Sequence, residues 1–287
     1  MSVHDLTWEQ AVQWLREQPE QADLVRACYY DDPLLEAAQR FAASEEWIAT
    51  LRLLPSKPAR ALDLGAGRGI SSYGLARAGW QVIALEPDPS PLVGSGAIRT
   101  LAAQTGLLID VIEEYGERLP IDADSLDLVY GRQVLHHARD LPQLCHEVAR
   151  VLKPGGVFVA VREHVISRKD DLPAFLESHA LHKFYGGENA FLLSEYRQAI
   201  LDSGLKIERQ LGPLENPVNY FPMTRQEWQQ ACASPLPRLL GESASNLLLS
   251  EDNPFGRSLL ALLSHVKTRL SNAPGRLYSF VARKNGP

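Results

Sequence analysis

Apolar residues follow two different patterns along the chain, one in the first 56 residues and another in the remainder. In residues 1–56 they recur at helical spacing, which predicts helices with one buried face. Beyond this region, short apolar runs alternate with helical segments, which predicts a parallel sheet with helices on both faces. The helical positions are Trp8, Val12, Leu15, Leu34, Leu35, Ala38, Phe41, Ala42 and Trp47, and the strand runs are 60–64, 81–86, 107–112, 126–130 and 156–162.

Capping and breaking residues define two of the later helices. Asp140 precedes one helix, which ends at the proline and glycines of 153–156. Ser194 is the expected N-cap of another helix, which stops at Gly204. The last two strands are expected at 205–211 and 277–282, with about 65 residues between them.

Residues 61–69 are the most informative segment, because an apolar run ends in Asp63 and continues into three glycines at alternating positions. Glycine has no Cβ, so the backbone of such a turn can lie directly against a ligand. Glu86 ends the next apolar run, where its carboxylate can accept hydrogen bonds from two ribose hydroxyls. These features predict a nucleoside cofactor. The three glycines are Gly65, Gly67 and Gly69.

The glycine spacing disfavours a dinucleotide cofactor, because the third glycine of that fingerprint would fall on Ile70 or Ser72. The order acidic-x-Gly-x-Gly-x-Gly instead resembles the motif of class I methyltransferases, which use S-adenosylmethionine. Three further blocks continue the resemblance in the same order over about a hundred residues: 119–130, 134–137 and 147–156. The resemblance implies an enzyme with a Rossmann-like α/β fold: a mainly parallel seven-stranded sheet with helices on both faces, a helical N-terminal region and a large insertion before the last strand.

In this family the last two strands form a hairpin with a short loop, so the long stretch between them here is an insertion. We expect it to cover the acceptor site together with the N-terminal helices, the alternative being a packing appendage or an oligomer contact. The predicted divisions are 1–56 for the N-terminal helices, 57–212 for the core, 213–275 for the insertion and 276–287 for the last core strand.

The resemblance also assigns cofactor contacts. Asp63 and the glycine turn are expected beside the amino-acid part of the cofactor, and Glu86 at its ribose. The position that usually carries the acidic adenine contact is Tyr115, so Tyr115, Glu114 or Asp110 is left as the candidate. The predicted cofactor-binding set is Asp63, Gly65, Ala66, Gly67, Gly69, Glu86, Pro87, Tyr115, Gly131, Arg132 and Gln133.

Acceptor recognition is predicted where polar residues follow the fifth apolar run, because ligands bind at the carboxyl ends of parallel strands. If the acceptor is a hydroxyl, then His164, His182 or Glu163 can serve as the base. The predicted acceptor contacts are His136, His137, His179, Tyr185, Glu188 and Asn189, although the histidines can also be structural or surface residues. The region loosely resembles bacterial methyltransferases of polysaccharide or glycoside assembly.

A metal site is an open alternative, because Glu163, His164, His179, His182 and Glu188 include nitrogen and oxygen ligands. No His-x-x-x-His spacing supports it, so we predict no metal. Cys28, Cys145 and Cys232 are widely separated and odd in number, which favours idle thiols in a reducing compartment.

Net charge is −6 with both signs interspersed, which disfavours a nucleic-acid partner. Neither a signal peptide nor a membrane span is apparent, so we expect a cytoplasmic protein.

The sequence therefore predicts an S-adenosylmethionine-dependent methyltransferase that methylates an oxygen of a small or glycan-like acceptor. Two alternatives stay open: the same fold using a modified adenosyl cofactor for another reaction, and a catalytically silent partner subunit. An oligomer is compatible with all three.

Overall fold

The computed structural model describes residues 6–179, 181–234 and 254–286. At its centre is an eight-stranded sheet in the order β3-β2-β1-β4-β5-β8-β7, with β6 paired to β5 beside this path. Strands β1 to β6 pair in parallel, and β8 runs antiparallel between β5 and β7. The strands are β1 Arg60–Leu64, β2 Gln81–Leu85, β3 Ile109–Ile112, β4 Leu126–Arg132, β5 Leu152–Ile166, β6 Phe191–Leu192, β7 Leu205–Leu211 and β8 Arg276–Lys284.

Helices cover both faces of the sheet, as the alternating pattern predicted. Because side chains alternate between the faces of a strand, Leu62 and Leu64 pack under α7 (Leu141–Val151) and α10 (Leu193–Asp202). Ala61 points to the other face, which is covered by α3 (Leu34–Ala42), α4 (Glu45–Leu51), α5 (Ile70–Arg77) and α6 (Ser95–Thr105).

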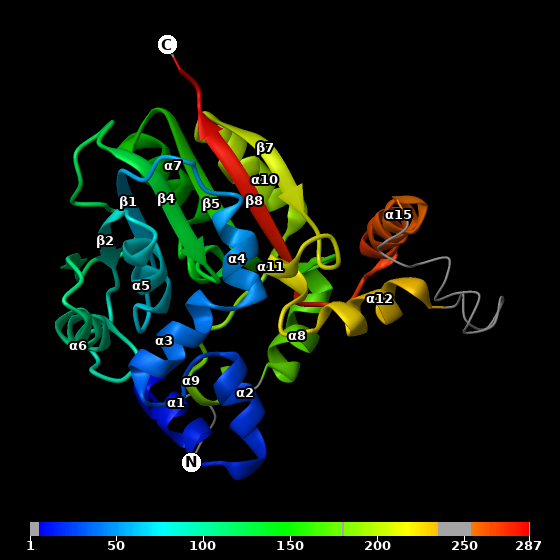
Figure 1. Cartoon of the computed structure of the whole chain (residues 1–287), viewed down its shortest axis with the longest axis horizontal. Coiled ribbons are helices and arrows are strands. Elements are labelled where there is room, and N and C mark those ends of the chain that lie inside the picture. The colour runs from blue at the N-terminus through cyan, green and yellow to red at the C-terminus, as the bar shows by residue number, and fades with distance from the viewer. Residues whose placement is uncertain (1–5, 180, 235–253, 287) are drawn as a thin grey trace.

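The N-terminal region divides into two pairs of helices. Helices α3 and α4 are separate because Ser44 ends the first pattern and caps the second, accepting a hydrogen bond from the Trp47 amide. Helices α1 (Trp8–Arg16) and α2 (Ala22–Ala27) pack instead beside α9 (His182–Tyr185). Figure 1 shows α1, α2 and α9 gathered beyond the end of the sheet toward which β4 points. They therefore lie at the carboxyl ends of the parallel strands.

Three predicted details of the core are wrong. The sheet has an eighth strand, because the two residues of β6 extend the pairing of the long β5. The run expected at 107–112 pairs only over Ile109–Ile112. Helix α10 begins at Leu193 rather than after Ser194, because the Glu195 carboxylate accepts a hydrogen bond from the Leu192 amide and so supplies the cap.

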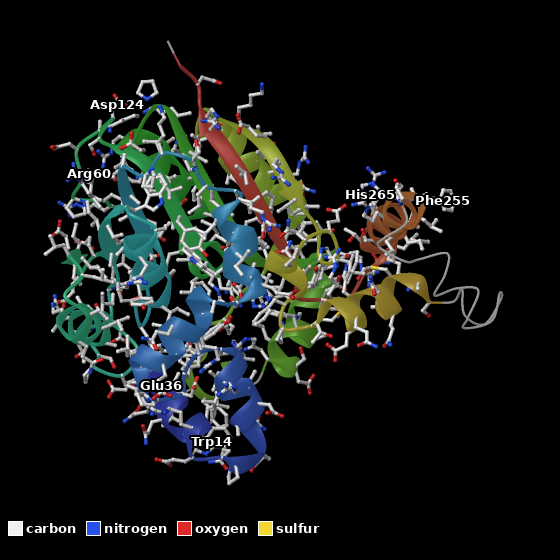
Figure 2. All side chains as sticks on the ribbon, viewed as in Figure 1. Trp14, Glu36, Arg60, Asp124, Phe255 and His265 are labelled. Atoms are coloured by element: carbon white, nitrogen blue, oxygen red, sulfur yellow. The ribbon has the colours of Figure 1, made fainter. Side chains whose placement is uncertain are left out.

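The described part of the insertion contains α11 (Pro217–Tyr220), α12 (Arg225–Ala233) and α15 (Pro254–Leu270). Helix α11 packs against α4, whereas α12 and α15 pack on each other with Cys232 and Leu260 in their shared core. Figure 2 shows Phe255 and His265 on α15, well apart from Trp14 of the N-terminal helices. None of the helices described is long and apolar enough to cross a bilayer.

The 3₁₀ turns are η1 (Pro19–Gln21), η2 (Leu135–His137) and η3 (Lys169–Asp171), and α8 spans Leu172–Ser178.

Candidate active site

A cavity of about 400 Å³ opens at the carboxyl ends of β1, β2 and β4. One part of its lining comes from the segments that carry the predicted cofactor contacts, and the other from the N-terminal helices and the stretch between β5 and β6. The first group includes residues 64–68, 85–87, 114–117, 132–134 and 136–139, and the second includes Trp8, Cys28, Tyr29, Tyr30, His164, His179, Leu181, Tyr185 and Glu188.

The glycine turn between β1 and α5 has a left-handed backbone at all three of its glycines. Gly65, Gly67 and Gly69 have φ values of 61°, 52° and 82°. The Ala66 amide donates to the Leu85 carbonyl over 2.9 Å, which ties the turn to the end of β2. A Cβ at Gly65 would lie 2.3 Å from a methyl carbon of Val134, so this position excludes any side chain.

Glu86 lies beside this turn at the carboxyl end of β2, and it is 9% exposed. One carboxylate oxygen accepts from the Gly67 amide over 2.8 Å and the other from the Asp88 amide over 3.0 Å. Burial raises the pKa of Glu86, and these two backbone hydrogen bonds oppose the shift. Each oxygen keeps a lone pair for a further donor from the cavity, which Pro87 also lines.

Three predicted cofactor residues lie outside the cavity lining. Asp63 is buried, and one of its oxygens accepts from the Ser72 hydroxyl over 2.6 Å while the other has no hydrogen-bond partner among the described residues. Burial raises the pKa of Asp63 to about 7. Gly69 starts α5, and Gly131 makes room for Val134. All three residues therefore support the glycine turn from outside the cavity lining.

Arg132 lines the cavity but its guanidinium is committed to a buried ion pair. Its Nε and Nη2 donate to the two oxygens of Glu46 over 2.6 and 3.1 Å. Its Nη1 donates to the Gln133 side chain over 2.9 Å. The Arg162 guanidinium lies 3.8 Å from the same carboxylate and donates to the carbonyls of Val218 and Phe221. Glu46 was absent from the sequence-based set because only the fold brings α4 onto β4.

Tyr115 lines the cavity near its mouth and is 49% exposed. The Arg139 guanidinium lies 4.6 Å from the centre of the Tyr115 ring, so one face of this ring is in contact with the arginine. Of the two acidic alternatives for the adenine contact, Glu114 lines the cavity, whereas Asp110 is exposed on β3 outside it.

Glu163 is fully buried behind the cavity wall and does not line it. It accepts hydrogen bonds from the amides of Val134 and His136, each over 3.1 Å, and from Nδ1 of His136 over 2.8 Å. Burial raises its pKa to about 7, against these backbone hydrogen bonds. A bulge in β5 between Ala160 and Glu163, where Arg162 has a φ of 63°, turns this carboxylate inward. Glu163 therefore holds η2 in place.

His136, His164 and Glu188 meet in the cavity, with one atom from each lying within 4.8 Å of the other two. Nδ1 of His164 contacts the Gly275 carbonyl over 3.0 Å, and Nε2 of His136 lies 3.6 Å from Oε2 of Glu188. The Tyr185 hydroxyl donates to Oε1 of Glu188 over 2.5 Å. Burial lowers the pKa of His136 well below its usual range and also lowers that of His164.

The other predicted acceptor residues are divided. His179 and His137 line the cavity, and Nδ1 of His137 contacts the Gly187 carbonyl over 3.0 Å. His182, the first residue of α9, and Asn189, the residue after Glu188, do not line it.

The cover over this part of the cavity comes from the N-terminal helices. The ring of Trp8 lies 4.5 Å from that of Tyr185, and the Leu6 amide donates to the Phe184 carbonyl. Arg68, directly after the glycine turn, donates to the carbonyls of Tyr29 and Asp31 and so fixes the segment that lines the cavity. Nothing in the described part of 213–275 lines it. The helical spacing of Trp8, Val12 and Leu15 predicted a buried helix face, but it did not predict that this face would cover the cavity.

Comparison with known proteins agrees with this architecture. Residues 62–160 match the family model described as a methyltransferase domain. An uncharacterized methyltransferase of Mycobacterium bovis is 40% identical over 107 residues, a match that spans 36% of this chain and 40% of that relative. The ubiquinone biosynthesis O-methyltransferase of Sinorhizobium medicae is 26% identical over 199 residues, which cover 68% of this chain and 76% of that protein.

Among solved structures, the geranyl diphosphate C-methyltransferase of Streptomyces coelicolor, in complex with Mg²⁺, geranyl diphosphate and S-adenosyl-L-homocysteine, superposes with a TM-score of 0.57. The two are 12% identical, and the match covers 99% of this chain and 89% of that one. The shared architecture is therefore the class I methyltransferase fold. Within this fold, residues 62–160 are the part of the chain that matches the methyltransferase domain model.

Proposed function

We propose that the protein transfers the methyl group of S-adenosylmethionine to a hydroxyl oxygen of a small or glycan-like acceptor. The observation that carries this proposal is a single cavity that joins two chemically different ends. At one end the glycine turn and Glu86 provide a nucleoside site, and at the other the imidazoles of His136 and His164 face the same space.

The donor end suits an adenosyl cofactor. Glu86 is held in one orientation by two backbone amides and keeps lone pairs for ribose hydroxyls. Gly65, Ala66 and Gly67 present backbone without obstruction beside it. The aromatic ring of Tyr115 and the carboxylate of Glu114 are the candidates for contact with adenine. S-adenosylmethionine, when bound here, supplies a sulfonium methyl group for in-line displacement.

The acceptor end suits a group that must lose a proton. Nδ1 of His164 donates to a carbonyl, so in neutral imidazole Nε2 carries the lone pair and can accept the hydroxyl proton. His164 is therefore the preferred base of the three predicted residues, since Glu163 and His182 lie outside the cavity lining. Trp8, Tyr30 and Tyr185 enclose this end, and we assign the role of acceptor cap to α1 and α9 rather than to the insertion.

The test is a turnover assay with S-adenosylmethionine and a panel of hydroxylated sugars and phenols, read by mass spectrometry of product and cofactor. The proposal expects S-adenosylhomocysteine to form together with a methylated acceptor, and His164→Gln to reduce the rate by roughly 10²–10⁴-fold. His146→Gln changes an exposed histidine on α7 and is the matched control.

The same experiment separates the alternatives. Recovery of a modified adenosyl species from the purified protein would favour another reaction, and absence of any adenosyl ligand or binding would favour a silent partner subunit.

We also propose that the acceptor is a small molecule or saccharide rather than a nucleic acid, and that the protein is cytoplasmic. In support, the cavity is lined by neutral and acidic groups around Glu86 and Glu188 as well as by arginine. All three cysteines are free thiols, as a reducing compartment favours.

A further inference from the structure

We propose that His136, His164 and Glu188 form a binding site for one divalent transition-metal ion, with Zn²⁺ as the reference occupant. The sequence analysis predicted no metal, and its alternative set of ligands shared His164 and Glu188 with this cluster. In the structure Glu163 lies behind the wall and His182 outside the cavity lining, whereas His136 joins the group.

The first argument is the orientation of the two imidazoles. Nδ1 of His164 can only donate to the carbonyl of Gly275, and Nδ1 of His136 faces a Glu163 oxygen that also accepts the His136 amide. Both rings are therefore fixed by their outer nitrogens and turn Nε2 toward the cavity. Metal-binding histidines are held in this way, by a carboxylate or a backbone carbonyl on the nitrogen away from the metal.

The second argument is the unsatisfied carboxylate oxygen. Glu188 is 9% exposed, and Tyr185 donates to only one of its oxygens. The other oxygen has no hydrogen-bond partner within the described chain and lies 3.6 Å from Nε2 of His136. With the imidazoles neutral, three acceptor atoms thus face one another, an arrangement that a bound cation would stabilise.

The distances fit a metal ion. In a tetrahedral zinc site with bonds of about 2.0–2.1 Å, ligand atoms lie about 3.3–3.4 Å apart. The present separations of up to 4.8 Å need a contraction of at most about 1.4–1.5 Å, within reach of side-chain movement. Two imidazoles and one carboxylate form a donor set that suits Zn²⁺, Co²⁺ or Fe²⁺ better than Mg²⁺.

Three protein ligands leave a coordination position open, which is typical of catalytic rather than structural sites. This open position faces the cavity, so an oxygen of the acceptor can occupy it. That last assignment rests on the proposed function, whereas the metal site itself does not. An ion held by Nε2 of His164 would replace that nitrogen as the group that activates the acceptor. It would make the bound hydroxyl lose its proton to solvent more easily than a free one, which is the chemistry that oxygen methylation needs.

The experiment is a Zn²⁺ titration of the full chain, expressed without a histidine tag and stripped with a chelator. We expect one equivalent to bind, and His164→Gln and Glu188→Gln to weaken binding by at least about tenfold. His146→Gln changes an exposed histidine outside the cluster and should bind as the wild type does. Co²⁺ should give the visible absorption of a four-coordinate site in the wild type, and Mg²⁺ should not compete.

S-adenosylhomocysteine binding, measured on the same samples, reports folding and separates the two proposals. Zn²⁺ binding without S-adenosylhomocysteine binding would support the metal site and contradict the proposed function. If the wild type binds S-adenosylhomocysteine but less than one equivalent of Zn²⁺, the metal site alone is overturned. The same holds if His164→Gln and Glu188→Gln bind Zn²⁺ with the affinity of the wild type. If the variants fail to fold, the Co²⁺ spectrum of the wild type decides, and its absence refutes the site.

Discussion

Near the cavity, the replacement of Glu46 by glutamine should destabilise the protein more than any other single replacement of a carboxylate by its amide. Glu46 is fully buried on α4, and both of its oxygens accept hydrogen bonds from the Arg132 guanidinium. Arg162 lies 3.8 Å from the same carboxylate. One negative charge therefore serves two buried positive charges, and its removal leaves both without a counter-ion.

The magnitude follows from that geometry. A glutamine can accept from Nε of Arg132, but its amide NH₂ would face Nη2, which is also a donor. Breaking a buried ion pair by removing one partner costs about 3–5 kcal/mol. Burial raises the pKa of Glu46, but Arg132 and Arg162 outweigh burial and hold it below its usual value. The carboxylate thus stabilises the fold above its unfolded pKa, and the stability is lost as pH falls through the lower folded value.

The assay is urea unfolding at pH 7 of the wild type, Glu46→Gln and a matched control, Glu45→Gln. Glu45 is the neighbouring residue, exposed in the first turn of α4, so its loss should cost at most about 1 kcal/mol. The expected loss for Glu46→Gln is about 3–5 kcal/mol in the free energy of unfolding. A loss within 1 kcal/mol of that of Glu45→Gln would refute the claim that this carboxylate holds the two arginines.

Two further changes test the glycine turn and its support. The folded pKa of Asp63, about 7, lies above its unfolded value, so the folded state binds more protons between pH 4 and 7. This group should therefore make the free energy of unfolding fall with rising pH by up to about 1.4 kcal/mol per pH unit. Asp63→Asn should remove that contribution when urea unfolding is measured over this pH range. An unchanged pH dependence would contradict a raised pKa for Asp63. Gly65→Ala should cost about 1–3 kcal/mol for the overlap with Val134 in addition to about 1–2 kcal/mol for left-handed backbone. Gly106 has a φ of +67° and open space around it, so Gly106→Ala should show the backbone cost alone. Equal losses of stability in Gly65→Ala and Gly106→Ala would exclude a cost from the overlap with Val134.

Much of the core was predictable because its signals are local. The turn at Gly65 to Gly69 needs left-handed backbone that glycine supplies, and the alternating apolar runs require a covered parallel sheet. The cap of α7 is equally local, since the Asp140 side chain accepts from the Gln143 amide as its position predicted.

The roles of residues in the acceptor end were less predictable, because tertiary packing decides them. Glu163 and His164 are adjacent in sequence, yet a bulge sends one behind the wall and leaves the other in the cavity. His136 stood in a turn that could equally be structural, and only the approach of Glu188 shows the cluster. The cover formed by Trp8 depends on contacts with α9, more than 170 residues away, which no local pattern encodes.

The central claim is that Glu86 holds the ribose of an adenosyl cofactor, and calorimetric titration with S-adenosylhomocysteine tests it most directly. The wild type should bind in the micromolar range. Glu86→Ala should lose about 1.5–3 kcal/mol, or roughly 10- to 150-fold in affinity, because hydrogen bonds to a charged acceptor disappear. Asp110→Asn, on the adjacent strand outside the cavity, should bind as the wild type does. Equal affinity of Glu86→Ala and the wild type, or no binding to the folded wild type, would contradict the account.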